Sequence, residues 1–158
     1  MVISVAASNS RFESVCDGLK ALDFVGLLAL DDAAQKEAYL KAERSSLDAQ
    51  EIRAADSLTV SANGLIGEYN MARAIIQVLK TNEWDARGAR AVIIGASGLA
   101  RAIARELSSS GVSNLSLFAE TQPSAESTTE GLAISTEKYA GTFTDSRLEH
   151  MLTEADLL

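Results

Sequence analysis

The second half of the chain changes its spacing of apolar residues twice within about thirty positions. The run Ala91-Val-Ile-Ile94 is short, apolar and partly β-branched, which is typical of a buried parallel strand. From Leu99 the apolar positions recur at helical spacing, at Ile103 and Leu107. A second apolar run, Leu115-Ser-Leu-Phe-Ala119, predicts another strand. The pattern therefore predicts a β-α-β unit with parallel strands.

The turn between the first of these strands and the helix is rich in glycine. Its sequence resembles the dinucleotide-binding pattern G-x-G-x-x-G/A, with Gly95, Ser97 and Ala100 at the three small-residue positions. Gly95 permits a tight turn and Ala100 lets the helix approach the strand, whereas the Cβ of Ser97 would crowd a phosphate. The candidate cofactor-binding residues of this turn are Gly95, Ala96, Ser97, Gly98, Leu99 and Ala100. The alternative is a β-α-β unit whose glycines serve only the turn and the packing.

An acidic residue, Glu120, follows the second strand directly. In dinucleotide-binding units an acid at this position accepts hydrogen bonds from the free ribose hydroxyls of NAD, and it would repel the 2′-phosphate of NADP. We therefore expect NAD or NADP as cofactor, with NAD favoured by Glu120. The alternative is that Glu120 is a solvent-exposed loop residue.

The first half of the chain predicts a smaller α/β lobe. Strands are expected at residues 2–7, 24–30, 57–61 and 65–67, and helices at about 11–22, 33–45, 48–55 and 70–80. Asn63-Gly64 is a strong hairpin signal between the last two strands. Ser10, with Glu13 as its capping-box partner, predicts the start of the first helix, and Asp31 or Asp32 predicts the start of the second.

A polar segment without periodicity, residues 81–88, predicts the boundary between lobes. We assign residues 1–82 to a shortened, substrate-type α/β lobe and residues 83–158 to a partial Rossmann-like nucleotide-binding domain. Downstream, residues 121–129 predict a loop with a short helix start, and 133–135 a weak strand; Asp145 or Ser146 is expected to cap a helix reaching Leu152. The segment 155–158 resembles the opening of another strand, so the expected α/β fold is a Rossmann-type parallel sheet truncated at the C-terminus.

Composition narrows the classes of partner. The net charge of -8 argues against nucleic acid and anionic membrane surfaces, which call for basic patches. No apolar run approaches the roughly 20 residues that span a bilayer. The start Met1-Val-Ile-Ser-Val5 lacks the basic residues of a signal peptide, so we expect a cytoplasmic protein.

The cysteine and histidine content limits redox and metal chemistry. Cys16 is the single cysteine, which excludes an internal disulfide, and its helical spacing from Phe12 and Leu19 predicts a place in the core. His150 is the single histidine, and the sequence holds no carboxylate cluster of the kind that binds metal. No metal site is therefore expected.

Two segments in a fixed order carry a family resemblance. The first runs from Ala54 to Ile75 and contains the hairpin followed by Gly-Glu-Tyr-Asn at residues 67–70; the second is Val92-Ile-Ile-Gly-Ala-Ser-Gly-Leu-Ala-Arg101. Their order and spacing resemble those of the shikimate/quinate 5-dehydrogenase family. In that family a strand leads to a hairpin, a glycine-tyrosine-asparagine-threonine-aspartate sequence opens a helix, and a glycine-rich turn follows the next strand. The ending Glu154-Ala-Asp-Leu-Leu158 also resembles the family's lead into its next strand.

The resemblance implies a reaction and candidate residues. Family members reduce 3-dehydroshikimate to shikimate with a nicotinamide cofactor, usually NADPH, and a lysine and an aspartate handle the proton at oxygen. The best match for the lysine is Lys36, although the preceding proline and histidine are absent, and alignment without a gap places Ala34 there instead. The aspartate position falls on Met71 or Ala72, neither of which can exchange a proton.

The binding residues of the family also correspond only in part. The substrate-contacting asparagine and threonine fall on Asp56 and Ser57, and a carboxylate at position 56 would repel a carboxylated substrate. Ser8-Asn9-Ser10 has the same residue types as the serine pair of the family, but it precedes a different secondary-structure element from the one that follows the pair in the family. Where NADP-dependent members have asparagine-arginine-threonine, this chain has Ala119-Glu120-Thr121, which again favours NAD.

Three functions follow in order of preference. The first is a shikimate dehydrogenase-like oxidoreductase of aromatic amino acid biosynthesis, with a nicotinamide dinucleotide and a small hydroxy-acid substrate. The second is a non-catalytic regulatory or assembly module of the same fold, which the missing aspartate and Asp56 favour. The third is a different enzyme that uses the same nucleotide turn. A homo-oligomer or a larger pathway protein is compatible with each of them.

Overall fold

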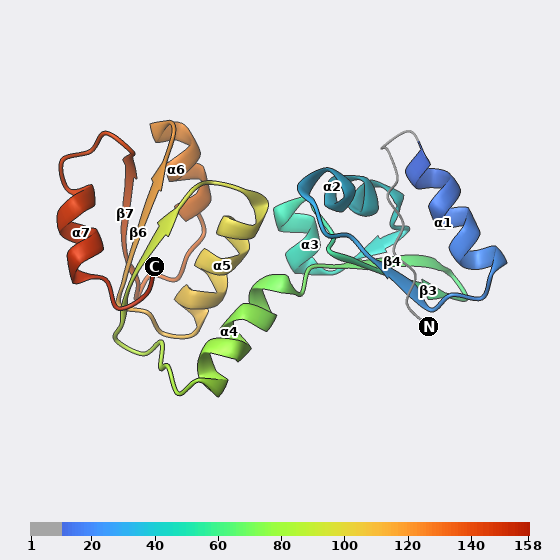
Figure 1. Ribbon diagram of the computed structural model, residues 1–158, viewed down its shortest axis with the longest axis horizontal. Helices are drawn as coiled ribbons and strands as arrows, with labels where there is room; N and C mark the ends of the chain where they lie inside the picture. Colours follow the sequence, from blue (N-terminus) through green and yellow to red (C-terminus); the bar gives the residue numbers. More distant parts are fainter. Residues whose placement is uncertain (1–10) are drawn as a thin grey trace. The chain divides into compact units, whose positions relative to one another are not determined.

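The computed structural model describes residues 11–158, and these fall into two compact units that divide between Asn70 and Met71 (Figure 1). The strand expected at residues 2–7 and the residues Ser8, Asn9 and Ser10 lie outside the described part of the chain. Each unit combines helices with its own sheet. The α/β class expected from the sequence is confirmed.

The first unit is built around a mixed sheet. Its helices are α1 (Phe12–Ala21), α2 (Asp32–Lys41) and α3 (Leu47–Ile52), and its strands are β1 (Gly26–Leu28), β2 (Arg44–Ser45), β3 (Ser57–Ser61) and β4 (Gly64–Glu68). The strand order is β1-β3-β4-β2, with β3 antiparallel to β1 and β4, and β2 parallel to β4. The hairpin predicted at Asn63-Gly64 joins β3 to β4, and Gly64 has a φ of +109° there.

Capping side chains set the starts of α2 and α3, and strand pairing sets one helix end. Asp31 caps α2, because its Oδ1 accepts a hydrogen bond from the Ala34 N–H at 2.9 Å. The helix expected to reach residue 45 ends at Lys41 instead, because Arg44 and Ser45 pair with Ile66 and Gly67 of β4. Cys16 lies in the core, as expected, and its burial raises the pKa of the thiol.

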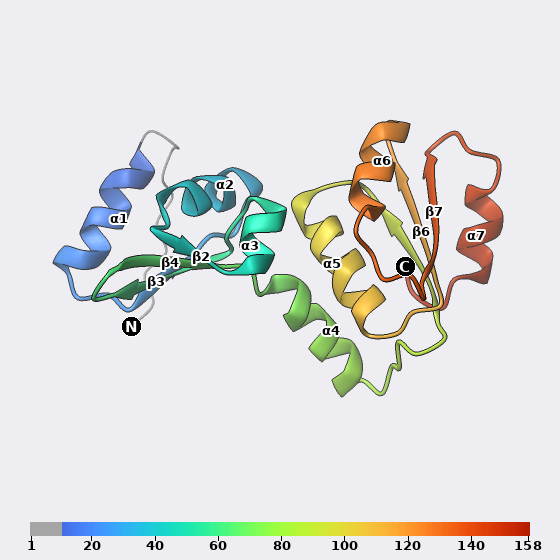
Figure 2. The same ribbon diagram turned by 180° about the vertical axis from the view of Figure 1, so that it is seen from behind.

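The second unit contains the Rossmann-type sheet. Its helices are α4 (Met71–Thr81), α5 (Gly98–Ser109), α6 (Gln122–Thr129) and α7 (Leu148–Glu154), and its strands are β5 (Arg90–Ile94), β6 (Asn114–Ala119) and β7 (Glu137–Thr142). The three strands are parallel in the order β5-β6-β7. Helices α5 and α6 cover one face of the sheet and α7 lies on the other (Figures 1 and 2). The predicted β-α-β unit is β5-α5-β6.

The C-terminal segment lies beside β5, on the edge away from β6. Leu157 forms a parallel bridge with Ala91, and its carbonyl accepts a hydrogen bond from the Val92 N–H at 2.9 Å. The strand opening expected at residues 155–158 is therefore confirmed. Because the chain leaves β5 toward β6 and returns on the opposite edge, β5 stands at the point where the strand order reverses, where open α/β sheets bind their ligands.

Two elements of the second unit differ from expectation. Residues 121–129 were expected to be mainly loop but form α6, which Pro123 does not interrupt because it lies in the first turn, where its missing N–H removes no helical bond. Residues 133–135 do not form a strand; the strand is β7, a few residues later. The pattern of apolar residues does not predict β7, because its first two residues, Glu137 and Lys138, are charged and exposed.

The core of the second unit holds the sheet and its helices together. Buried residues from five helices and strands form it, among them Ile76, Leu107, Leu117 and Ala125. Because Ile76 is part of this core, α4 belongs to the second unit. The boundary expected from the sequence, between residues 82 and 83, places α4 in the first lobe instead. On the opposite face of the sheet, Phe118 is fully buried beside Gly141, where an added Cβ would lie 2.9 Å from the Phe118 ring.

The loop between β7 and α7 is held by Asp145. Its carboxylate accepts hydrogen bonds from the Tyr139 hydroxyl and from the Arg147 N–H, the latter at 2.9 Å. The Arg147 guanidinium lies over the Tyr139 ring at 4.1 Å from its centroid. These bonds, chiefly the one from Tyr139, lower the pKa of Asp145 to about 2.

We expect Asp145→Asn to lower the melting temperature of the second unit at pH 7 and to have no effect below pH 2. A carboxyl whose pKa falls from about 3.9 in the unfolded chain to about 2 in the native state stabilises the fold above pH 4. That contribution disappears as the pH drops from about 4 to about 2. The measurement is thermal unfolding across pH, followed by the fluorescence of Trp84, the single tryptophan, which packs on the core of this unit. Glu149→Gln on the exposed side of α7 is the control, and an equal, pH-independent loss in both variants would contradict the expectation.

Candidate functional site

The glycine-rich turn and Glu120 lie at the same edge of the parallel sheet. Ile94 at the end of β5 pairs with Phe118 of β6, and the Gly95 N–H donates to the Phe118 carbonyl at 2.8 Å. Glu120 follows the end of β6 at Ala119. The structure therefore brings together the two parts of the candidate cofactor site that the sequence placed 25 positions apart.

Gly95 has a backbone conformation that favours glycine. Its φ is +110°, and no atom lies within 4 Å of the position that a Cβ would take. The requirement for glycine here is therefore conformational, and the space in front of the turn is open. An open space bounded by backbone is what a phosphate group needs for close approach to the turn.

Ser97 is the N-cap of α5. Its Oγ accepts a hydrogen bond from the Ala100 N–H at 3.2 Å, and its carbonyl accepts one from the Arg101 N–H at 3.1 Å. The N–H groups of Gly98 and Leu99 have no hydrogen-bond partner within residues 11–158. Serine at the second small position thus stabilises the helix start while two donors stay free at the positive end of the helix dipole. Ala100 is buried, as close packing of helix on strand requires.

Glu120 is exposed, and its side chain makes no hydrogen bond or ion pair with any described residue. The residue before it, Ala119, accepts a hydrogen bond from the Phe143 N–H at 3.2 Å, and Phe143 is 47% exposed. An exposed carboxylate and a half-exposed aromatic residue therefore follow neighbouring strands at the same edge of the sheet.

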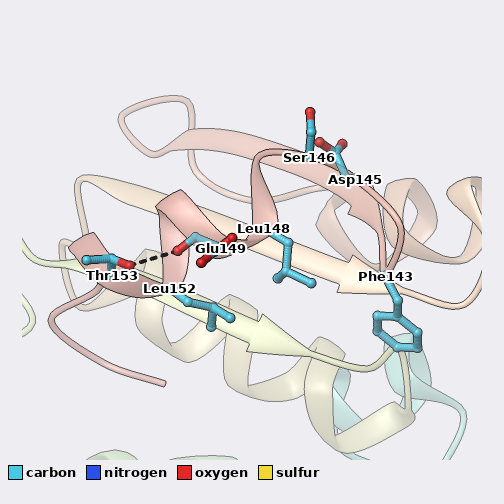
Figure 3. A pocket seen from close by; sticks show the side chains of 7 residues that line it. All are labelled: Phe143, Asp145, Ser146, Leu148, Glu149, Leu152 and Thr153. Atoms are coloured by element: carbon cyan, nitrogen blue, oxygen red, sulfur yellow. Dashed lines mark hydrogen bonds between the residues drawn. The ribbon is translucent and has the colours of Figure 1, made fainter.

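A hollow of about 530 Å³ opens between Phe143 and α7. Figure 3 shows Phe143, Leu148 and Leu152 pointing into it, with Asp145 and Ser146 at its rim. Its lining combines three apolar residues with two acidic and two hydroxyl-bearing ones, and the sequence pattern does not predict it. The signal that could have found it is Phe143 itself, an aromatic residue directly after a strand that the sequence pattern missed.

The first unit has a second group of polar residues, gathered where β1 and β4 end and β3 begins. Asp56 is buried, and its Oδ2 accepts a hydrogen bond from the Asn70 N–H at 2.6 Å. The Asn70 side chain in turn donates to the Ser57 Oγ at 3.3 Å. The two residues expected to bind substrate, Asp56 and Ser57, are therefore joined through Asn70.

Gln35 and Tyr69 complete this group. Both are buried; Gln35 Nε2 donates to the Ala29 carbonyl at 3.2 Å, and the Tyr69 hydroxyl lies 3.5 Å from Gln35 Oε1. Burial, followed by the charges of Asp56 and Asp32, raises the pKa of Tyr69 to about 12. Tyr69 is consequently a hydrogen-bond donor throughout the neutral range. Tyr69 and Asn70 belong to the segment that resembles the family, but the sequence alone predicts no role for either.

Lys36, the candidate proton donor, has a different environment. Its side chain is exposed and makes no hydrogen bond or ion pair with the described residues, whereas the preceding residue Gln35 bonds within the buried group. At the expected aspartate position, Ala72 is buried and Met71 is half-buried.

A metal-binding cluster and a membrane-spanning helix are both absent from residues 11–158. No three or more His, Cys, Asp or Glu side chains come close enough together to hold a metal ion. None of the helices in this range combines the length and apolar character needed to cross a bilayer.

The fold and the turn define the class of the chain: an α/β protein in which a small mixed-sheet unit precedes a Rossmann-type parallel sheet. No family model matches the sequence, and no curated protein matches it. Solved structures do match in fold, and several of them are shikimate dehydrogenases.

Three solved structures represent these matches. Shikimate dehydrogenase from Mycobacterium tuberculosis aligns with a TM-score of 0.79 at 17% identity, over 97% of this chain and 56% of its own. Shikimate 5-dehydrogenase from Listeria monocytogenes, solved with shikimate and NAD, aligns with a TM-score of 0.77 at 18% identity, over 96% and 54%. The 5-ketofructose reductase of Gluconobacter sp. strain CHM43 aligns with a TM-score of 0.74 at 23% identity, over 89% and 50%. The chain thus has the fold of part of a shikimate dehydrogenase and spans about half the length of these structures.

Proposed function

We propose that this chain is a shikimate dehydrogenase-like oxidoreductase, which interconverts 3-dehydroshikimate and shikimate, or a quinate analogue, with a nicotinamide dinucleotide. The observation that carries the proposal is the β5-α5-β6 unit. It combines the open turn at Gly95, two free N–H groups at the start of α5, and Glu120 at the same sheet edge. The fold likeness to shikimate dehydrogenases supports the choice of reaction.

Each residue of the edge has a part in holding the cofactor. The N–H groups of Gly98 and Leu99 would bind the pyrophosphate at the positive end of α5. Glu120 would accept hydrogen bonds from the ribose, which favours NAD over NADP. The exposed ring of Phe143 provides an apolar surface beside that ribose. The cofactor, when bound, supplies or accepts the hydride.

The substrate end of the proposal rests on Asp56, Ser57 and Lys36. Ser57 and Asn70 offer a hydroxyl and an amide for hydroxyl groups of a substrate, and Lys36 is the residue proposed to exchange the proton at the carbonyl oxygen. Asp56 is already occupied by the Asn70 N–H, so part of its role is to fix the position of Asn70.

A non-catalytic module of the same fold is the second candidate. The observations that favour it are the exposed position of Lys36 and the side chains of Met71 and Ala72, which cannot exchange protons. Both candidates predict dinucleotide binding, and they differ in turnover.

Thermal unfolding with NAD and with NADP, each at millimolar concentration, tests the cofactor site. Binding to the native state raises the melting temperature, because it stabilises by RT ln(1 + [L]/Kd), or about 2.7 kcal/mol at a hundredfold excess over Kd. No shift with either dinucleotide would refute the site. Dinucleotide-dependent oxidation of shikimate or quinate separates the two candidates, and 5-ketofructose reduction belongs in the same assay because a neighbour in fold is named for it.

We expect Glu120→Arg to shift the preference between NAD and NADP toward NADP by about 10-fold or more. The substitution removes the acceptor for the ribose hydroxyls and introduces a cation for the 2′-phosphate, and 10-fold corresponds to about 1.4 kcal/mol. The measurement is the ratio of the two dissociation constants. Glu130→Arg, at another exposed acid of the same unit, is the matched control for the change in net charge. An unchanged ratio in Glu120→Arg would show that Glu120 does not face the ribose.

A further inference from the structure

Gln35 is a buried amide with partners on both of its polar side-chain atoms. It lies in α2 and is 5% exposed. Its Nε2 donates to the Ala29 carbonyl at 3.2 Å, and its Oε1 faces the Tyr69 hydroxyl at 3.5 Å. Its main-chain carbonyl accepts a hydrogen bond from the Ala55 N–H at 2.9 Å. A buried amide adds little net stability, but with its partners in place it fixes the geometry around it.

The hydrogen bonds of Gln35 reach Asp56 from two directions. Ala55, which donates to the Gln35 carbonyl, directly precedes Asp56 in the chain. Ala29, which accepts from the Gln35 side chain, donates its own N–H to the Asp56 carbonyl at 2.8 Å. The segment that leads into β3 is therefore tied to α2 and to the end of β1 through one residue.

Asp56 connects Gln35 to the two residues proposed to bind substrate hydroxyls. Its Oδ2 accepts the Asn70 N–H at 2.6 Å, and the Asn70 side chain donates to the Ser57 Oγ at 3.3 Å. All of these residues belong to the first unit. The positions of the Ser57 hydroxyl and the Asn70 amide thus depend on Gln35, although no hydrogen bond between described residues joins Gln35 directly to either of them.

We infer that Gln35 is a positioning residue, which through Asp56 fixes the polar groups proposed to bind the hydroxyls of the substrate. The inference rests on the proposed function. Because the amide is buried, its part is to hold other groups in place and not to bind the ligand itself. Its removal leaves the Ala29 carbonyl and the Tyr69 hydroxyl without these partners, so the segment around Asp56 loses its fixed position. The residues proposed to hold the cofactor lie in the second unit, so the effect is expected on the substrate alone.

The experiment measures the dissociation constants of shikimate, quinate and NAD separately, by isothermal titration. Gln35→Met keeps a side chain of similar length and removes both polar atoms. We expect it to weaken the hydroxy acids by about 10-fold and to leave NAD unchanged. Tyr69→Phe removes only the hydroxyl that faces Gln35 Oε1 across 3.5 Å, so we expect a smaller effect of about 3-fold on the same ligands.

Cys16→Ala is the control for a general loss of stability. Cys16 lies in the core of the same unit, so its truncation is expected to lower the melting temperature. Binding of the hydroxy acids is expected to stay unchanged at temperatures where this variant is folded. A variant that is destabilised but binds normally shows that lost stability alone does not change the affinity.

Gln35→Glu is the rescue variant. At about pH 8 the introduced carboxylate is charged and cannot donate to the Ala29 carbonyl. Burial raises the pKa of a carboxyl, and once protonated near pH 5 the group can again donate to this carbonyl and accept from the Tyr69 hydroxyl. We therefore expect its hydroxy-acid affinity, relative to the wild type at the same pH, to rise by about 10-fold as the pH falls over this range.

The possible outcomes separate the inference from the proposed function. Equal weakening of NAD and the hydroxy acids in Gln35→Met, or an equal effect in Cys16→Ala, would overturn the inference. Unchanged hydroxy-acid affinity in Gln35→Met would overturn it while the proposed function stands. If Gln35→Met does not fold, the pH response of Gln35→Glu decides, and a flat response counts against the inference. If the wild type binds neither shikimate nor quinate, the proposed function itself fails, and the inference fails with it.

Discussion

Phe118→Ala is expected to lower the free energy of unfolding of the second unit by about 3 to 5 kcal/mol. The ring is fully buried in β6, packs against Tyr139 with 5.7 Å between ring centroids, and fills the space above Gly141. Removing it leaves a cavity in a sheet face that only α7 covers within the described part of the chain. The measurement is urea unfolding followed by Trp84 fluorescence, which reports on this unit.

Phe143→Ala is the matched control for this substitution. It removes the same side chain from the same unit, but at a position that is 47% exposed. We expect a loss of about 1 to 2 kcal/mol, smaller than that of Phe118→Ala, since about half of Phe143 stays exposed to solvent in the folded state. Equal losses in the two variants would show that Phe118 does not occupy the core position described above.

Gly95→Val is expected to abolish measurable dinucleotide binding and to destabilise the second unit by about 2 kcal/mol or more. At a φ of +110°, a β-branched side chain is strongly disfavoured, so the turn must change its backbone conformation. The Gly98 and Leu99 N–H groups, which follow the turn, would then lose their positions. Isothermal titration with NAD measures the first effect, and urea unfolding measures the second.

Gly88→Val separates strain from loss of the site. Gly88 also has a positive φ, +74°, and no atom lies within 4 Å of its missing Cβ, but it precedes β5 and is therefore at the opposite end of the strand. We expect a comparable loss of stability with NAD binding retained at temperatures where the variant is folded. Retained binding in Gly95→Val, or equal loss in Gly88→Val, would contradict the assignment of the turn.

The β5-α5-β6 unit could be predicted because each of its signals is local. A buried parallel strand is apolar throughout, glycines mark the turn, and the helical spacing begins immediately afterwards. The strands that were missed or misplaced depend on partners far away in the sequence. Arg44 and Ser45 become extended because β4 lies beside them, and β7 takes its place through pairing with β6.

The residues of the candidate site likewise differ in whether local sequence could predict them. Gly95 and Glu120 were predictable because they immediately follow strands, where the sheet edge is formed. Lys36 is a candidate because the residues around it match the family motif, but its exposure depends on which side of α2 faces the core. Successive residues of a helix are rotated by about 100°, so the burial of Gln35 and Ala38 leaves Lys36 exposed.

Gly141 and Phe118 impose a joint constraint on sequence change. Any side chain at position 141 would meet the ring at position 118, and a smaller residue at 118 would leave a void that a side chain at 141 could fill. The two positions are therefore expected to co-vary among homologues: glycine at 141 with a large aromatic at 118, and alanine or serine at 141 with a smaller apolar residue at 118. Gly141→Ala alone is then expected to be removed by selection. The same change together with a smaller residue at position 118 is expected to be tolerated.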